Sequence, residues 1–272
     1  MEEKKYGFTG ETMVFEAEDG KHTLQRIIAL RDFENALTGV TVKVGDLGGW
    51  VEKEENLAHE GACWLFDESK ALGNAEVYHD AVLHDRACIS GNAKACDRAW
   101  LLDDVKVHEN AMIFGHCVLY DKAVVCGRAN VHGGACVHGD VHVSGHANIY
   151  GDSEVGASQT MQEETNEQFT PGQVRVDGDA RIYDNALVID NATVTGNAEI
   201  FGNANILDNS VISENVKVGG NAVIMGDTVL KGDMEIKGSV IHQKVKREPT
   251  IGQTLKAGLK PRTDRLAELE KQ

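Results

Sequence analysis

The sequence predicts an all-β protein, a parallel β-helix with a non-repeating N-terminal cap and a short, partly helical C-terminal tail. Two observations lead to this fold class: a six-residue repeat that fills residues 72–155 and 177–242, and a composition with 29 glycines, 3 prolines and only 6% aromatic residues. Such a composition suits a backbone with many tight corners better than a large packed globule. With 42% hydrophobic residues, the 272-residue chain still has enough apolar side chains for a folded core.

The repeat has a distinct role for each of its inner positions. Cut every six residues from Leu72, the chain aligns with itself fourteen times up to Val155, and eleven more repeats run from Asp177 to His242. The sixth position is apolar in every repeat but the last and the fourth is Ala in sixteen, so both face inward. Position two is Gly in fifteen and Asp or Glu in nine, and position three is Asn in ten and Asp in seven. These residues tolerate left-handed backbone, so each repeat predicts a short strand followed by a corner.

This pattern resembles the hexapeptide-repeat left-handed β-helix, in which three hexads form one coil. Residues eighteen apart then stack at a spacing of about 4.8 Å. Charges alternate at that interval in two series: Arg86, Asp104, Lys122 and Asp140, and Arg181, Glu199, Lys217 and Glu235. The alternation supports three hexads per coil. We expect these ladders to be structural, with about 0.2–1 kcal/mol for each pair.

The repeats divide the chain into three parts. Residues 1–56 are predicted to form a strand-rich cap that covers the open edge of the first coil. The β-helix spans 57–242 and is interrupted by an inserted loop at 156–170, because residues 171–176 read as a further hexad. The tail, 243–272, carries eight Lys or Arg against four acids and leucines spaced as in short amphipathic helices. It could cap the last coil or receive phosphate groups.

With this loop boundary, one outward column is apolar along nearly its whole length. The column and its flanking residues are Phe66, His84, Leu102, Tyr120, His138, Ile189, Leu207 and Met225, beside Val82, Trp100, Val118, Leu187 and Val223. A stripe of this size is unusual on a monomer and predicts a subunit interface. The β-helix resemblance implies a homotrimer. The alternative is that the loop or the tail covers the stripe.

A family resemblance is carried by LQRIIALRDF, by VGDLGGWVEKEENLAHEGACWLFDESKA and by the repeats. They resemble the YdcK-like family of hexapeptide-repeat proteins, which are often labelled acyltransferases and are also carried by phages and prophages. Hexapeptide acyltransferases use a histidine at the trimer interface as general base and hold coenzyme A or acetyl-CoA along the groove between coils. On this resemblance His138 is the first candidate, because it lies on the apolar column about one coil from the inserted loop. His116 and His132, near an adjacent corner, are the second candidates.

The candidate ligand contacts follow from the charge of the coenzyme. A coenzyme with several phosphates fits an acidic body poorly unless Arg98, Arg128 or the tail supplies positive charge. Trp100 and Tyr120, on the apolar face, are the other candidate ligand-binding residues. No acyltransferase signature surrounds the candidate histidines.

A possible metal site rests on a short motif. YHDAVLHD holds His79 and His84 five residues apart and resembles the GHxAxxHG element of the γ-class carbonic anhydrases, in which two such histidines bind one metal across a subunit boundary. His59 could supply the third ligand. Tyr78 and Asp85 replace the flanking glycines of that element.

Three function classes remain open from the sequence. The first is a trimeric protein that binds a small ligand, such as a nucleotide, or a partner at subunit interfaces without turnover. Its support is an outward aromatic column that could stack on bases or be ordinary strand surface: Tyr78, Phe114, Tyr150, Tyr183 and Phe201. The second is a coenzyme A-dependent acyltransferase. The third is an acidic scaffold or DNA mimic.

The net charge and the cysteines bear on the binding partners and on the cellular compartment of the protein. A net charge of −16 argues against direct binding of nucleic acid or of a membrane surface. The six cysteines show no CxxC spacing, and no apolar run has the length of a signal peptide or a membrane span. We therefore expect a cytoplasmic protein with reduced thiols.

Overall fold

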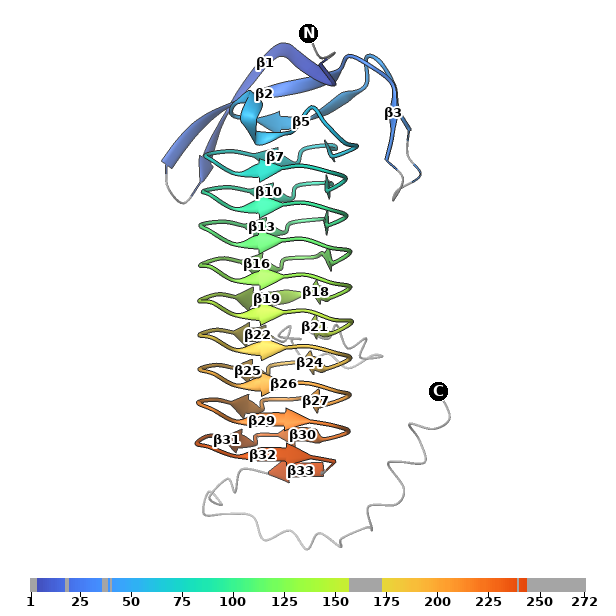
Figure 1. The fold of residues 1–272 in the computed structure, drawn as a ribbon. Helices are drawn as coiled ribbons and strands as arrows, with labels where there is room; N and C mark the ends of the chain where they lie inside the picture. The colour runs from blue at the N-terminus through green and yellow to red at the C-terminus, as the bar shows by residue number, and fades with distance from the viewer. Residues whose placement is uncertain are drawn as a thin grey trace, which may run out of the picture.

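The computed structural model describes residues 4–17, 20–35, 39, 41–156, 173–238 and 240–243. The chain winds through three sheets in which the strands of the coils are parallel, and each of these strands, apart from those at the ends of a sheet, pairs with the strands one coil before and one coil after it (Figure 1). The predicted all-β, parallel β-helix fold is thereby confirmed. The predicted helical tail lies, apart from Gln243, outside the described residues. In the described part of the chain, no helix has the length and apolar character needed to cross a membrane.

The three sheets are numbered here in the order in which each coil visits them. The first sheet contains β1 (Tyr6–Ala17), β2 (Gly20–Ala29), β5 (Leu47–Val51), β7 (Lys70–Ala71), β10 (Cys88–Ile89), β13 (Lys106–Val107), β16 (Val124–Val125), β19 (Asp140–Val143), β22 (Gln173–Val176), β25 (Thr193–Val194), β28 (Val211–Ile212) and β31 (Val229–Leu230). The second contains β8 (Glu76–Val77), β11 (Lys94–Ala95), β14 (Met112–Ile113), β17 (Asn130–Val131), β20 (Asn148–Ile149), β23 (Arg181–Ile182), β26 (Glu199–Ile200), β29 (Lys217–Gly219) and β32 (Glu235–Lys237). The third contains β6 (Trp64–Leu65), β9 (Val82–Leu83), β12 (Trp100–Leu101), β15 (Val118–Leu119), β18 (Cys136–His138), β21 (Glu154–Gly156), β24 (Leu187–Ile189), β27 (Asn205–Ile206), β30 (Val223–Gly226) and β33 (Val240–Gln243). A separate hairpin pairs β3 (Phe33–Glu34) with β4 (Thr41–Val42), and η1 (Glu54–Asn56) is a 3₁₀ turn.

The register of the strands confirms three hexads per coil. Cys88 pairs with Lys70 on one side and with Lys106 on the other, in both cases at a separation of eighteen residues. Across the insertion, Val141 pairs with Val174, so β22 takes the next place in the first sheet. β21 continues to Gly156, one residue into the predicted loop.

The repeat positions have the burial that the hexads predict. Ala111 and Ile113, positions four and six of one hexad, are both fully buried, and the pattern recurs along the solenoid. At position two, an acid with positive φ accepts the N–H of the residue eighteen further on: Asp103, with φ 54°, accepts from Asp121 at 3.0 Å. Each such carboxylate joins its own corner to the corner of the next coil.

Several of the contacts expected between the alternating charges are present. Arg86 binds Asp104 through two parallel hydrogen bonds, each 2.6 Å long. Glu199 lies between Arg181 and Lys217, at 2.5 and 3.0 Å. These contacts link neighbouring coils, which is the structural role predicted for them.

The N-terminal strands close the first coil. β5 pairs antiparallel with β2 and parallel with β7, so it turns the cap into the solenoid. The Lys5 side chain anchors this cap: its Nζ donates to the carbonyl of Cys63 at 2.8 Å and lies 3.1 Å from the Cys63 thiol sulfur. Lys5 is fully buried, and this burial lowers its pKa.

Replacing Lys5 by methionine is expected to destabilise the protein by about 2 kcal/mol, because a buried carbonyl then loses its donor. Lys4 is the matched control. Its amine forms an exposed ion pair with Glu54 at 2.6 Å, so Lys4→Met should change stability by less than about 0.5 kcal/mol. Thermal unfolding of both variants checks this, and equal losses would contradict the anchoring role.

Candidate active site

The outward side of the third sheet carries two parallel columns of side chains. Together they form what we call the apolar face: Phe66, His84, Leu102, Tyr120, His138, Gly156, Ile189, Leu207 and Met225, beside Trp64, Val82, Trp100, Val118, Cys136, Glu154, Leu187, Asn205 and Val223. The predicted apolar column is thus present, with Gly156 between His138 and Ile189. Most of these side chains remain partly exposed on the single chain.

His138 is held on this face by three neighbours. Its ring stacks on Tyr120, with 4.8 Å between centroids and 6° between planes. Its Nε2 lies 2.9 Å from Oε1 of Glu154. The ring lies over Gly156, where a Cβ would come within 2.2 Å of the imidazole, so only glycine leaves room for it. The side chain of His138 is only 15% exposed.

This arrangement is compatible with general-base chemistry at His138. When the neutral ring donates its Nε2–H to Glu154, Nδ1 carries the lone pair that can take a proton. The carboxylate then fixes the tautomer and stabilises the imidazolium, as the acid does in a Ser-His-Asp triad. Burial, with a contribution from Cys136, raises the pKa of Tyr120 to about 12, so the phenol stays protonated beside the ring at neutral pH.

Four of the predicted site residues therefore lie on the apolar face: His138, Tyr120, Trp100 and His84. Glu154 and Gly156 belong to the same cluster, and the sequence reasoning missed them. The signal that would have found them is the coil period, because Gly156 follows His138 by eighteen residues and Glu154 by sixteen.

Arg98 and His116 lie together at the corner between the second and third sheets, which borders the apolar face. They line an open groove of about 440 Å³, whose complete lining is Gly61, His79, Asp80, Asp97, Arg98, Gly115 and His116. Arg128 lies elsewhere, at the corner between β16 and β17. That corner does not border the third sheet, so one chain does not bring Arg128 to His138.

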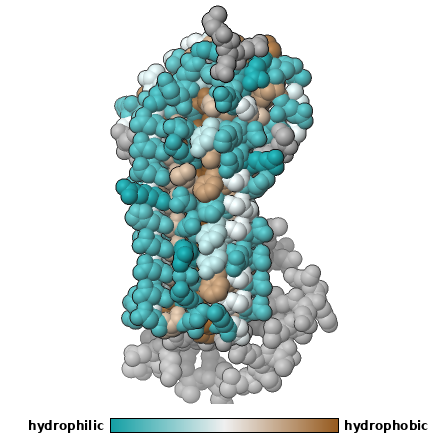
Figure 2. Space-filling model, in the orientation of Figure 1, coloured by the Kyte–Doolittle hydropathy of each residue, from teal (hydrophilic) through white to brown (hydrophobic). Residues whose placement is uncertain are grey.

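His132 belongs to a ladder of rings on the second sheet. The rings of Phe114, His132, Tyr150, Tyr183 and Phe201 stack in succession, with centroids 4.5, 5.1, 4.9 and 5.5 Å apart and planes within 11° of parallel. Figure 2 shows one side of the solenoid, where a narrow band of apolar and weakly polar side chains runs between hydrophilic columns. Because the rings cover one another's faces, the ladder favours strand surface over the stacking of bases.

The ladder should make stability depend on pH through His132. Burial lowers the pKa of His132 below 6.5, against a smaller opposing influence of the Asn148 side chain. The unfolded chain therefore takes up the proton first, and stability is lost as pH falls below about 6.5. His132→Phe keeps the stack and should lose less stability between pH 7.5 and 5.5 than the unchanged protein, in thermal unfolding. Equal losses of stability in the two proteins would contradict a partly buried His132 that stays neutral in the folded state.

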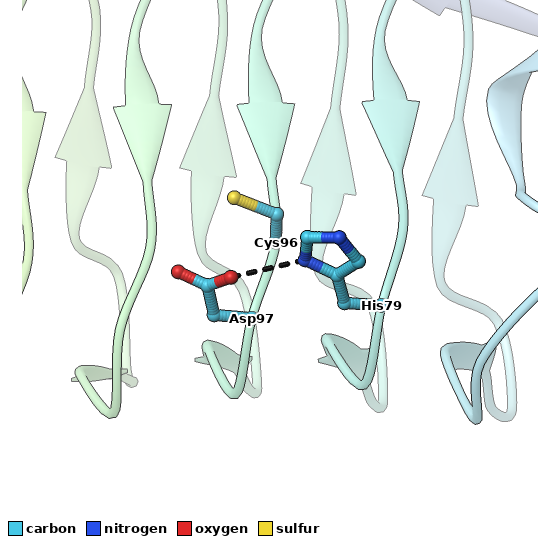
Figure 3. A group of neighbouring side chains, drawn as sticks. All are labelled: His79, Cys96 and Asp97. Atoms are coloured by element: carbon cyan, nitrogen blue, oxygen red, sulfur yellow. Dashed lines mark hydrogen bonds and ion pairs between the residues drawn. The ribbon is translucent and has the colours of Figure 1, made fainter.

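The three predicted metal ligands have separate partners on the described chain. His59 Nε2 lies 2.6 Å from Oε1 of Glu54. The ring of His84 stacks on Phe66 at 4.2 Å. His79 instead lies beside Cys96 and Asp97, on the neighbouring coil (Figure 3).

Fold and site together define a hexapeptide-repeat parallel β-helix with a histidine–glutamate pair on an apolar sheet face. Over 94 residues, 33% of this chain, the sequence is 33% identical to the "Uncharacterized acetyltransferase YdcK" of Escherichia coli (strain K12). The match spans 26% of the length of that protein. No family model matches the chain. The similarity and the fold confirm the predicted resemblance to YdcK-like hexapeptide-repeat proteins.

Proposed function

We propose that this protein is a hexapeptide-repeat acyltransferase that works as a homotrimer, with His138 as general base and Glu154 as the carboxylate that orients it. The observation that carries the proposal is the contact of 2.9 Å between His138 Nε2 and Glu154, on a face whose other side chains are mostly apolar. The similarity to the "Uncharacterized acetyltransferase YdcK" of Escherichia coli (strain K12) supports the same class.

The proposed chemistry is transfer of an acyl group from a thioester to a hydroxyl or amine. Acetyl-CoA, the acetyl thioester of coenzyme A, would supply the acyl group when bound. Nδ1 of His138 takes the proton of the acceptor as the acceptor attacks the thioester carbonyl, and the imidazolium is stabilised by Glu154. His138 then returns this proton to the thiolate that leaves.

Two features of the chain support binding and reaction of acetyl-CoA: a positive charge for its phosphate groups and an apolar face that can exclude water. Arg98 lies at a corner that borders the apolar face, and a guanidinium there suits a phosphate group. Association of chains through the apolar face would shield the His138–Glu154 pair from water and so strengthen the attraction between the imidazolium and the carboxylate. Both points support a site completed between subunits.

The test combines native mass spectrometry with an assay of acetyl transfer from acetyl-CoA to a panel of amines and alcohols, followed by chromatography and mass spectrometry. We expect a trimer that binds acetyl-CoA. His138→Ala should lower turnover by about 100-fold or more with binding and assembly retained, because a general base contributes about 10²–10⁴-fold. His142→Ala, on the first sheet, is the matched control and should leave turnover unchanged.

The same experiment separates the other function classes. A tightly bound nucleotide without any acetyl transfer would indicate a binding protein instead of an acyltransferase. A trimer with neither ligand nor turnover would favour the acidic scaffold, and a monomer would contradict the interface.

A further inference from the structure

We infer that His79, Cys96 and Asp97 form a binding site for a divalent transition-metal ion of the zinc type. One ligand atom from each of these side chains lies within 4.8 Å of the other two. Figure 3 shows the three together, His79 from one coil and Cys96 with Asp97 from the next. This donor set differs from the predicted set of His79, His84 and His59.

The geometry is close to what a zinc ion requires. Zinc binds sulfur at about 2.3 Å and nitrogen or oxygen at about 2.0–2.2 Å, so tetrahedral ligands lie roughly 3.3–3.6 Å apart. His79 Nδ1 and Asp97 Oδ1 are already 3.0 Å apart, and their side chains are 62% and 45% exposed. Cys96 is only 6% exposed. Asp97 also accepts the N–H of Gly115 through Oδ2 at 3.2 Å, so its Oδ1 and the more exposed His79 ring would close on the buried thiol with shifts of about 1 Å.

A second, independent observation is the backbone of His79. Position two of the hexads is Gly, Asp or Glu in every repeat except the one that holds His79. His79 has φ 58°, and the other non-glycine residues with positive φ in the described chain are all Asp or Glu. Left-handed backbone costs a bulky residue about 1–3 kcal/mol. In place of a carboxylate that accepts an N–H, this corner presents an imidazole whose Nδ1 lies 3.0 Å from Oδ1 of Asp97, in the corner of the next coil.

The donor set selects the type of ion. One imidazole, one thiolate and one carboxylate suit zinc, whereas magnesium and calcium prefer all-oxygen sites. Burial raises the pKa of the Cys96 thiol, which a bound ion would deprotonate. A hydrogen bond with Tyr78 favours the thiolate, as outer-shell donors do at metal sites.

Access to the site is provided by the groove at the same corner. His79 and Asp97 line this groove of about 440 Å³, together with Asp80, Arg98 and His116. Three protein ligands with one open position are the arrangement of zinc sites that also bind water or substrate. The site does not depend on His138 or on trimer formation, so it can be tested separately from the proposed function.

The experiment is a titration of metal-free, full-length protein with Co²⁺, followed by competition with Zn²⁺. We expect a single ion per chain and a thiolate-to-cobalt charge-transfer band. Cys96→Ala should abolish the band and weaken zinc binding by more than about 100-fold, because even outer-shell changes cost about 10–100-fold. Cys88→Ala, a partly exposed thiol of the first sheet, is the control and should behave as the unchanged protein.

His79→Gly is a second variant that tests the site even if Cys96→Ala does not fold. Glycine is the commonest residue at this corner position, so the substitution should keep or raise the thermal stability of the metal-free protein, and still weaken zinc binding by more than about 100-fold. Undiminished zinc binding in His79→Gly, or loss of binding in His84→Ala, would overturn the assignment.

Discussion

Gly202→Val is expected to lower the free energy of unfolding by about 3 kcal/mol, and Gly202→Asp by less than about 1 kcal/mol. Gly202 has φ 69°, a conformation that is strongly unfavourable for a β-branched residue. A Cβ there would meet the backbone nitrogen of Gly220 at 2.9 Å and its carbonyl oxygen at 3.0 Å.

The aspartate variant is the matched control because the chain already uses aspartate at this corner. Asp184, one coil earlier, has φ 61° and accepts the N–H of Gly202 at 3.0 Å. An aspartate at 202 can accept the N–H of Gly220 in the same way, which offsets part of the strain. Chemical denaturation measures both variants, and equal losses would show that the carboxylate does not compensate for a side chain at this corner.

The six-residue period predicted the fold well because it determines both which residues face the core and which residues stack between coils. Ala111 and Ile113 are examples of core residues, and Arg86 and Asp104 are examples of stacked residues. The place of residues 171–176 in the repeat also follows from the period. The amino-acid sequence was sufficient for these inferences, because the backbone of the coil fixes whether the side chain at each repeat position points inward or outward.

The site was predicted only in part, because it depends on side-chain directions. The period places Glu154 near His138. The imidazole can direct its Nε2 at the glutamate, however, only because Gly156 leaves room for the ring. The linear motif drew attention to His79 and His84, which stand on a corner and on a sheet face. The ligand atoms that lie within 4.8 Å of His79 belong to Cys96 and Asp97, seventeen and eighteen residues later.

The aromatic column shows the same limit. Its predicted members omitted His132, which completes the stack between Phe114 and Tyr150. A histidine was treated as a candidate base because of its chemistry, whereas its column position makes it part of a ring ladder. Stacking partners eighteen residues apart therefore carry more information in this fold than sequence neighbours do.

Gly156→Val tests the proposed active site without changing any residue that carries the chemistry. The new side chain would occupy the space of the His138 ring, since even a Cβ approaches its Nε2 to 2.2 Å. The imidazole must then swing away from Glu154, and acetyl transfer should fall by about 100-fold or more, as in His138→Ala. The backbone of Gly156 is not in the left-handed region, so valine itself is compatible with the strand.

Gly219→Val is a close steric match at the end of β29 on the second sheet. There the ring of Phe201 lies over the glycine, and a Cβ would come within 2.3 Å of it. Overpacking should cost both variants about 1–3 kcal/mol of stability. Only Gly156→Val should lose acetyl transfer, measured by release of coenzyme A at a temperature where both are folded. Equal turnover in the two variants would remove the His138–Glu154 pair from the mechanism, because the same steric change would then have the same effect on either face.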